Sequence, residues 1–89
     1  MTHWKCFGVS EMYNAFGLLG VRLLSEAGVF YEVGANEYHA PCIGDVVIVP
    51  DDVNGRPMFE LRGYEIPERK LPDAPPEVVA EVWSIPEVV

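Results

Sequence analysis

All eight prolines of this chain lie at or beyond residue 41, and none occurs among the first forty residues. Proline fixes its φ angle and lacks a backbone N–H, so it disfavours helix interiors and the middle of sheets. The first third of the chain is therefore expected to be capable of forming a helix, and the remainder to be rich in turns. The 89 residues leave room for one compact domain.

The segment from residue 10 to residue 27 has the apolar spacing of an amphipathic helix. Ser10 is a typical N-cap, Glu11 places a negative charge in the first turn, and Gly28 is a typical C-terminal stop. Apolar residues recur at three- and four-residue steps. The predicted buried stripe consists of Met12, Phe16, Leu19, Leu23 and Ala27.

Two glycines, Gly17 and Gly20, lie inside this predicted helix. A glycine costs a helix interior up to about 1 kcal/mol relative to alanine. Their presence suggests that another element approaches the helix backbone closely. That element is either another part of the same fold or a helix of a partner protein.

β-branched and aromatic residues separated by turn residues indicate strands in the rest of the chain. We expect strands over His3–Val9, Val29–Val33, from Tyr38 onward, Asp45–Val49 and Met58–Ile66. Together with the helix, they predict an α+β fold in which one amphipathic helix packs on an antiparallel sheet of about four strands.

The last two predicted strands are expected to form a hairpin. Asn54-Gly55 is a strong turn dipeptide, and it lies in the acidic loop Pro50–Pro57. In the second strand of this hairpin, alternation places Phe59 and Leu61 on one face, which we expect to be buried.

Residues 71–89 are predicted to be a Pro/Val-rich acidic C-terminal segment that follows a single domain of residues 1–70. Its centre, Glu77–Ile85, fits either a short helix or a β-branched strand. Val79, Val82 and Trp83 carry too much apolar area to remain in water. The segment therefore either packs on the domain or docks on a partner.

The net charge is −8, from 14 acidic and six basic residues. Binding to nucleic acid or to an anionic membrane requires an excess of Lys and Arg, so both are disfavoured. The longest apolar run, Ala15–Val21, is far shorter than the roughly 20 residues that a membrane-spanning helix needs. No signal peptide is recognisable, and we expect a cytoplasmic protein.

Every His and Cys of the chain belongs to one of two similar motifs, His3-x-x-Cys6 and His39-x-x-Cys42, each followed by an apolar residue and glycine. Two such turns would supply a tetrahedral zinc shell of two His and two Cys. The spacing is similar to the paired knuckles of zinc-ribbon domains, with His where those knuckles usually carry Cys. Zinc is the one cofactor that the sequence suggests.

Other interpretations of these residues stay open. Cys6 and Cys42 are also explained as small buried side chains or as a disulfide. His39 and Cys42 resemble a base and a thiol nucleophile, but no orienting group or oxyanion loop accompanies them. The chain also lacks a phosphate-binding glycine loop and a nucleophile elbow, so we expect no enzymatic activity.

The acidic charge suggests a protein–protein interaction module that binds a basic surface. In size, charge and lack of a catalytic motif, the chain resembles phage-encoded inhibitors such as anti-CRISPR proteins, which act as nucleic-acid mimics. This resemblance implies a viral protein, in the cytoplasm of the host cell, that occupies a nucleic-acid-binding surface. The predicted partner-binding residues are Asp51, Asp52, Glu60, Glu65, Glu68 and Asp73, with Tyr64 and Trp83 as anchors.

Two alternatives explain the same composition. The chain could be a structural or metal-stabilised small subunit of a larger assembly, whose valine-rich tail adds to a sheet of its partner. The negative charge could also serve solubility alone.

Overall fold

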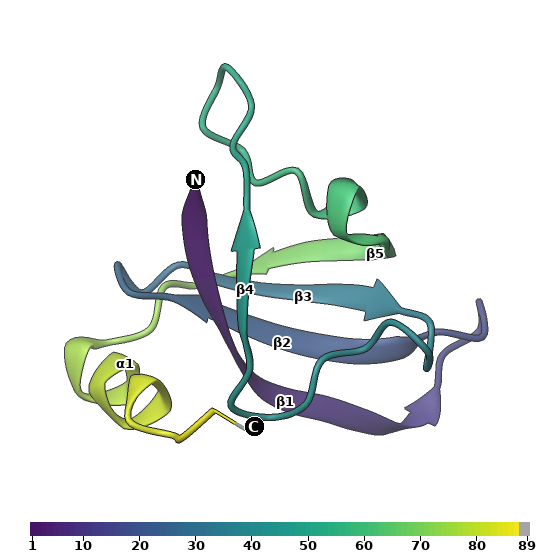
Figure 1. The fold of residues 1–89 in the computed structure, drawn as a ribbon, viewed down its shortest axis with the longest axis horizontal. Helices are drawn as coiled ribbons and strands as arrows, with labels where there is room; N and C mark the ends of the chain where they lie inside the picture. Colours follow the sequence, from purple (N-terminus) through teal and green to yellow (C-terminus); the bar gives the residue numbers. More distant parts are fainter. Residues whose placement is uncertain (88–89) are drawn as a thin grey trace.

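The computed structural model describes residues 1–87, except for the side chains of residues 66–68. The chain forms a curled, five-stranded antiparallel sheet and a short C-terminal α-helix (Figure 1). Along the sheet the strands lie in the order β4-β1-β2-β3-β5. The elements are β1 (Thr2–Tyr13), β2 (Leu19–Ser25), β3 (Phe30–Ala35), β4 (Val46–Val49), the 3-10 helix η1 (Phe59–Arg62), β5 (Tyr64–Leu71) and α1 (Pro76–Trp83).

The helix predicted over 10–27 is wrong, because this segment contains the end of β1, a turn and the whole of β2. Gly17 adopts φ +74° in the turn. The side-chain Oδ1 of Asn14 accepts hydrogen bonds from the backbone N–H groups of Phe16 and Leu18, at 2.8 and 3.0 Å. A turn that satisfies its own backbone groups competes with a helix over the same residues.

The strand β1 is long enough to pair with two neighbours. Its first residues, Thr2–Lys5, pair with β4, and the stretch from Trp4 to Tyr13 pairs with β2. The β1–β2 register shifts between Cys6 and Gly8 and again between Val9 and Tyr13. Such irregularities increase strand twist and bend, in keeping with the curl of the sheet.

The core fills the inside of this curl and is centred on aromatic side chains. Trp4 makes edge contacts with Tyr31 and Phe59, at ring-centroid distances of 5.5 and 5.3 Å. Around them pack the smaller side chains of Cys6, Val21, Leu23, Val33, Ala35, Val47 and Val49. Phe59 belongs to η1, so this 3-10 turn inserts one ring into the core.

The later predicted strands are correct in part. The predictions Val29–Val33 and Asp45–Val49 correspond to β3 and β4, whereas the segment from Tyr38 is a turn. Residues 58–66 contain η1 and the start of β5. Because η1 is helical, Phe59 and Leu61 do not share a face: Phe59 is buried and Leu61 is 64% exposed.

The predicted hairpin between the last two strands is also wrong. The strand β4 pairs with β1, and β5 pairs with β3, so the two lie at opposite edges of the sheet. The loop between them is closed at its base by a bridge between Asp51 and Pro57. Local turn chemistry identified the turn but not the strands' partners.

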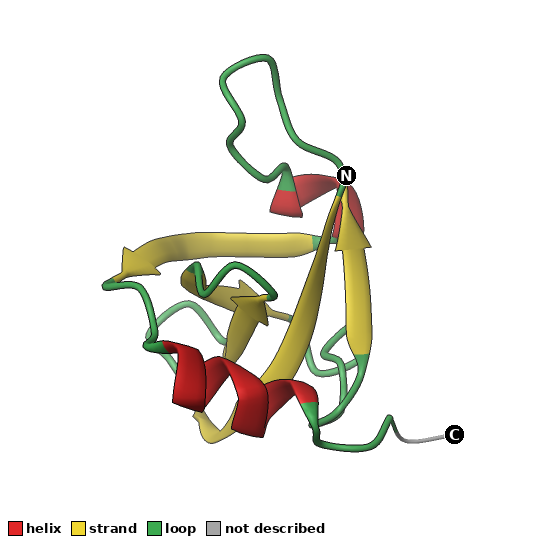
Figure 2. Cartoon of the chain, turned by 90° about the vertical axis from the view of Figure 1, so that its left-hand side faces the viewer, coloured by secondary structure: helices red, strands yellow, loops and turns green. Residues whose placement is uncertain are grey.

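Residues 77–85 were predicted to form either a short helix or a strand. Most of this segment belongs to the helix α1 (Figure 2). Pro76 occupies the first turn, where a missing N–H costs nothing. Val82 is buried, and the backbone N–H of Ala74 donates to the carbonyl of Gly28 at 2.9 Å. The C-terminal segment therefore packs on the sheet. In the part of the chain that the structure describes, no helix is long and apolar enough to cross a membrane.

Candidate functional site

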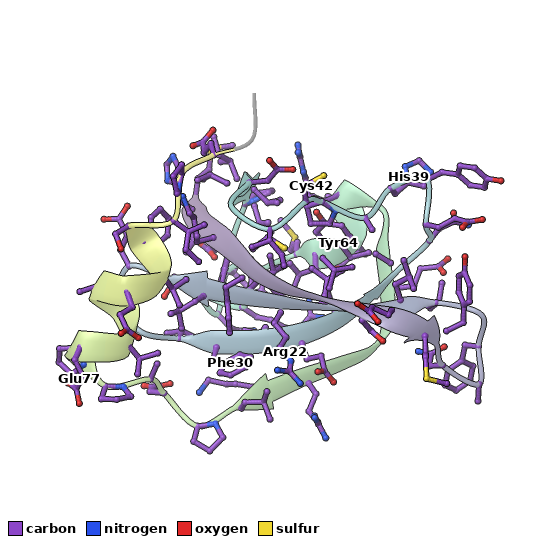
Figure 3. All side chains as sticks on the ribbon, turned by 90° about the horizontal axis from the view of Figure 1, so that it is seen from below. Arg22, Phe30, His39, Cys42, Tyr64 and Glu77 are labelled. Carbon is purple, nitrogen blue, oxygen red and sulfur yellow. The ribbon has the colours of Figure 1, made fainter. Side chains whose placement is uncertain are left out.

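The four predicted zinc ligands do not converge. His3 and Cys6 lie three residues apart in the extended strand β1, where such residues point to opposite faces and are about 10 Å apart. Accordingly, His3 is exposed and Cys6 is fully buried. His39 and Cys42 lie on the exposed β3–β4 loop (Figure 3). Among the side chains that the structure describes, no three or more His, Cys, Asp or Glu residues are grouped to hold a metal ion.

Both cysteines are free thiols with different surroundings. Burial raises the pKa of the Cys6 thiol from 9.0 to about 11, so it stays neutral at physiological pH and packs as a small apolar group. Cys42 is exposed, and its backbone N–H donates to the Asp45 carboxylate at 2.8 Å. The buried environment of Cys6 therefore does not favour a thiolate.

Three of the predicted partner-binding carboxylates stabilise the loop that carries them. Asp51 accepts hydrogen bonds from the Thr2 hydroxyl at 2.9 and 3.1 Å and lies 3.5 Å from the terminal amine. Asp52 accepts from the backbone N–H groups of Asn54 and Arg56 at 2.8 and 2.9 Å. Glu60 lies 3.6 Å from Arg56. These contacts partly neutralise the three carboxylates and hold them in place.

The remaining predicted carboxylates are spread along β5. Glu65 lies near the start of the strand, whereas Asp73 lies beyond its end and pairs with Lys70 at 3.3 Å. At about 3.3 Å per residue, Glu65 and Asp73 are about 20 Å or more apart. The side chain of Glu68 lies outside the described residues. Glu65 and Asp73 therefore lie too far apart to act as one cluster of charge.

The two predicted aromatic anchors are turned inward. Tyr64 is 6% exposed and packs near Phe59, and burial raises the pKa of its hydroxyl from 10.0 to about 12. Trp83 is half-buried, and its ring lies over the buried Lys5, with 5.8 Å between the ammonium nitrogen and the ring centroid. The main role of both side chains is therefore packing within the fold.

Most of the cations lie close to carboxylates or are covered by the fold. Arg22 and Arg69 both lie within 3.5 Å of Glu32, and Lys70 and Arg56 are paired as described above. Several exposed carboxylates have no ion pair among the described side chains. These are Glu11, Glu26, Glu37, Glu65, Glu77, Glu81 and Glu87. Much of the negative charge is therefore presented to solvent without a local counter-charge.

A surface that the sequence interpretation missed lies at the β1–β2 turn. Met12, Tyr13, Phe16 and Tyr38 are 78%, 53%, 68% and 84% exposed. The Tyr13 hydroxyl donates to the Glu37 carboxylate, which raises the pKa of Tyr13 and joins this turn to the β3–β4 loop. In Figure 3, His39, which follows Tyr38, lies at the same end of the molecule as the β1–β2 turn. We call Met12, Tyr13, Phe16 and Tyr38 the hairpin surface.

A groove of about 580 Å³ adjoins the hairpin surface on the outer side of the sheet. Its lining includes Met12 and Tyr13 together with glycines from three neighbouring strands, Gly8, Gly20 and Gly34. A Cβ at Gly20 would lie 3.7 Å from Ser10 Cβ, an ordinary contact distance, so the fold itself does not demand glycine there. The missing side chain at Gly20 leaves open space over the sheet, whereas a Cβ at Gly8 would lie 3.2 Å from Arg22 Cδ.

No protein family, curated protein or solved structure matches this chain.

Proposed function

We propose that this chain is a non-enzymatic, acidic protein–protein interaction module that binds a basic surface of its partner. The observation that carries the proposal is the distribution of charge. Arg22, Arg69, Arg56 and Lys70 are paired with carboxylates, and Lys5 is buried, while seven exposed carboxylates have no ion pair among the described side chains. The resulting field attracts a basic protein and accelerates the encounter.

A basic surface of this kind is typical of proteins that bind nucleic acids. We therefore propose that the chain inhibits such a protein by occupying its nucleic-acid-binding surface, in the manner of a phage-encoded, anti-CRISPR-like inhibitor in the host cytoplasm. The exposed carboxylates take the place of backbone phosphates in this proposal. Direct binding of the chain to nucleic acid is disfavoured by its net charge of −8.

The test is capture on the immobilised chain from a lysate of its native host, followed by washes at low and then high salt. Mass spectrometry identifies the retained proteins. The proposal expects a basic, nucleic-acid-binding protein that high salt releases and that DNA or RNA displaces, because exposed charges are screened by salt. A partner that resists high salt would instead support the alternative, a structural subunit held by apolar contacts.

Charge-neutralising variants then test the carrying observation on the captured partner. Glu11→Gln combined with Glu65→Gln removes two exposed charges without ion pairs, and we expect the association rate at low salt to fall roughly threefold to tenfold. Glu60→Gln is the matched control, since its carboxylate already lies beside Arg56. Association rates that do not change in the double variant would contradict steering by these carboxylates.

A further inference from the structure

We propose that the hairpin surface, together with the groove beside it, is the face that docks the basic partner, with its apolar side chains as the anchors. This inference rests on the proposed function, since it names the interface through which the partner is bound. It differs from the sequence prediction, which placed the anchors at Tyr64 and Trp83.

The first argument is exposure. Single exposed apolar residues are normal on a protein surface. Here Met12, Phe16 and Tyr38 are each more than two-thirds exposed, and Tyr13 is half-exposed. They gather at one end of the molecule, where two of them, Met12 and Tyr13, also line a groove of about 580 Å³. Exposed apolar groups that adjoin a concave surface mark interaction sites.

The second argument is preorganisation. Asn14 fixes the turn through the backbone N–H groups of Phe16 and Leu18. In the neighbouring loop, Asn36 accepts in the same way from the N–H of Tyr38, at 3.0 Å. The hydrogen bond between Tyr13 and Glu37 then ties the two segments together. A partner that docks here pays little entropy for ordering the backbone that carries the anchors.

The third argument is charge, which selects the occupant. Glu11 and Glu37 belong to the same two segments as the anchors and are exposed. Glu65 is exposed on β5, opposite Gly34 of the groove lining. Arg22, the cation in the groove lining, lies 3.5 Å from Glu32. An apolar centre with carboxylates around it complements a surface on which Arg or Lys side chains surround apolar ones.

The tyrosines add a further reason for a basic partner. Tyr13 and Tyr38 are both largely exposed, and an arginine of the partner would gain cation–π energy by stacking on their rings. A second copy of this chain is disfavoured, because each copy carries a net charge of −8. The glycine-lined groove gives room for one projecting side chain of the partner.

The experiment uses the full chain, labelled for NMR, and two synthetic probes: a peptide of alternating Arg and Leu, and the same peptide with Glu in place of Arg. Expected are chemical-shift changes with the Arg-Leu peptide at the hairpin surface and at Gly8, Gly20 and Gly34. The Glu-Leu peptide is expected to cause none. Glu77, at the opposite end of the molecule from His39 (Figure 3), is expected to be unaffected.

Variants assign the binding energy. Phe16→Ser combined with Tyr38→Ser removes two exposed anchors, and we expect the affinity for the Arg-Leu peptide to fall about tenfold or more. Val53→Ser combined with Val78→Ser is the control, since these side chains are 100% and 37% exposed elsewhere; it is expected to change affinity less than about twofold. Gly20→Val fills the groove and is also expected to weaken binding.

The outcomes separate this inference from the proposed function. Shift changes centred on α1 or on the loop 51–57, or an equal effect of the control variant, would overturn the docking face and leave an acidic binding module. Failure of the Arg-Leu peptide to bind anywhere would overturn both. Dimerisation in sedimentation experiments that Phe16→Ser abolishes would identify a second copy as the occupant and overturn the basic partner.

Discussion

Replacing Gly44 by alanine is the sharpest test of how the C-terminal segment docks on the sheet. Gly44 has φ +101° just before β4, and its N–H donates to the carbonyl of Cys6 at 2.7 Å. A Cβ at this position would lie 2.2 Å from the carbonyl oxygen of Pro86. That distance is far inside van der Waals contact, so either the β4 approach or the segment around Pro86 must move.

The magnitude has two parts. A positive φ costs a non-glycine residue about 1–2 kcal/mol. Movement of the segment around Pro86 would add the loss of its packing on the loop before β4, where Ile85 also lies 3.5 Å from the added Cβ. We expect Gly44→Ala to lower the free energy of unfolding by about 3 kcal/mol. Gly63→Ala is the matched control, because φ is +79° there and no atom lies within 4 Å of the added Cβ; its cost is about 1–2 kcal/mol.

The assay is urea unfolding of both variants, in the full chain and in a chain truncated after Ser84. Truncation removes the Pro86 carbonyl, so the cost of Gly44→Ala should fall toward that of Gly63→Ala, while Gly63→Ala keeps its own cost. Such a change is a coupling between position 44 and the tail, as a double-mutant cycle defines it. Equal costs for the two substitutions in the full chain would refute the reasoning.

Two further predictions follow from buried and loop-forming groups. The folded-state pKa values of Cys6 and Tyr64 lie above their ordinary values of 9.0 and 10.0, so the folded chain holds these protons more tightly than the unfolded chain. The stabilisation from both protons is complete below pH 9. The contribution of Cys6 is lost as pH rises through about 11, and that of Tyr64 as pH rises through about 12. Urea unfolding measured from pH 8 upward should show the free energy of unfolding fall by up to about 3 kcal/mol because of Cys6. Cys6→Ala should abolish the part of this fall that lies between pH 9 and 10. An unchanged pH dependence in Cys6→Ala would contradict this prediction. Asp52→Ala should lower the free energy of unfolding by about 1 kcal/mol, since two backbone N–H groups lose their acceptor. Asp52→Asn should keep most of it, because its amide oxygen still accepts, and equal losses in the two variants would count against the loop-stabilising role.

The sequence predicts the strands that are defined by local composition. Aromatic residues with Val33 mark β3, four consecutive β-branched residues mark β4, and the region before residue 10 is extended as expected. The helix prediction failed because the segment 10–27 satisfies two periods at once. Leu19 and Leu23 fit a helical stripe, but Leu19, Val21 and Leu23 also alternate along one face of a strand. Pairing with β1 and β3 on both sides favoured the strand.

The residues predicted for the functional site depended on whether residues 10–27 form a helix or strands. A helix would have buried Met12 and Phe16 with the leucines, so sequence analysis assigned them to the core. Asp51 and Asp52 were predicted as partner contacts because their charge is visible in the sequence, whereas their hydrogen bonds to Thr2 and to loop N–H groups are not. Whether a carboxylate is available to a partner depends on such contacts.

The residues that misled the helix prediction also give the argument for the interface. The core of the described chain is complete without Met12 and Phe16, since the curl is filled by Trp4, Phe59 and the side chains around them. Asn14 and Gly17 shape the turn without these apolar groups. Polar residues would therefore serve folding equally well at positions 12 and 16. Their apolar character has no role inside this fold, which is why we assign it to a contact with another molecule.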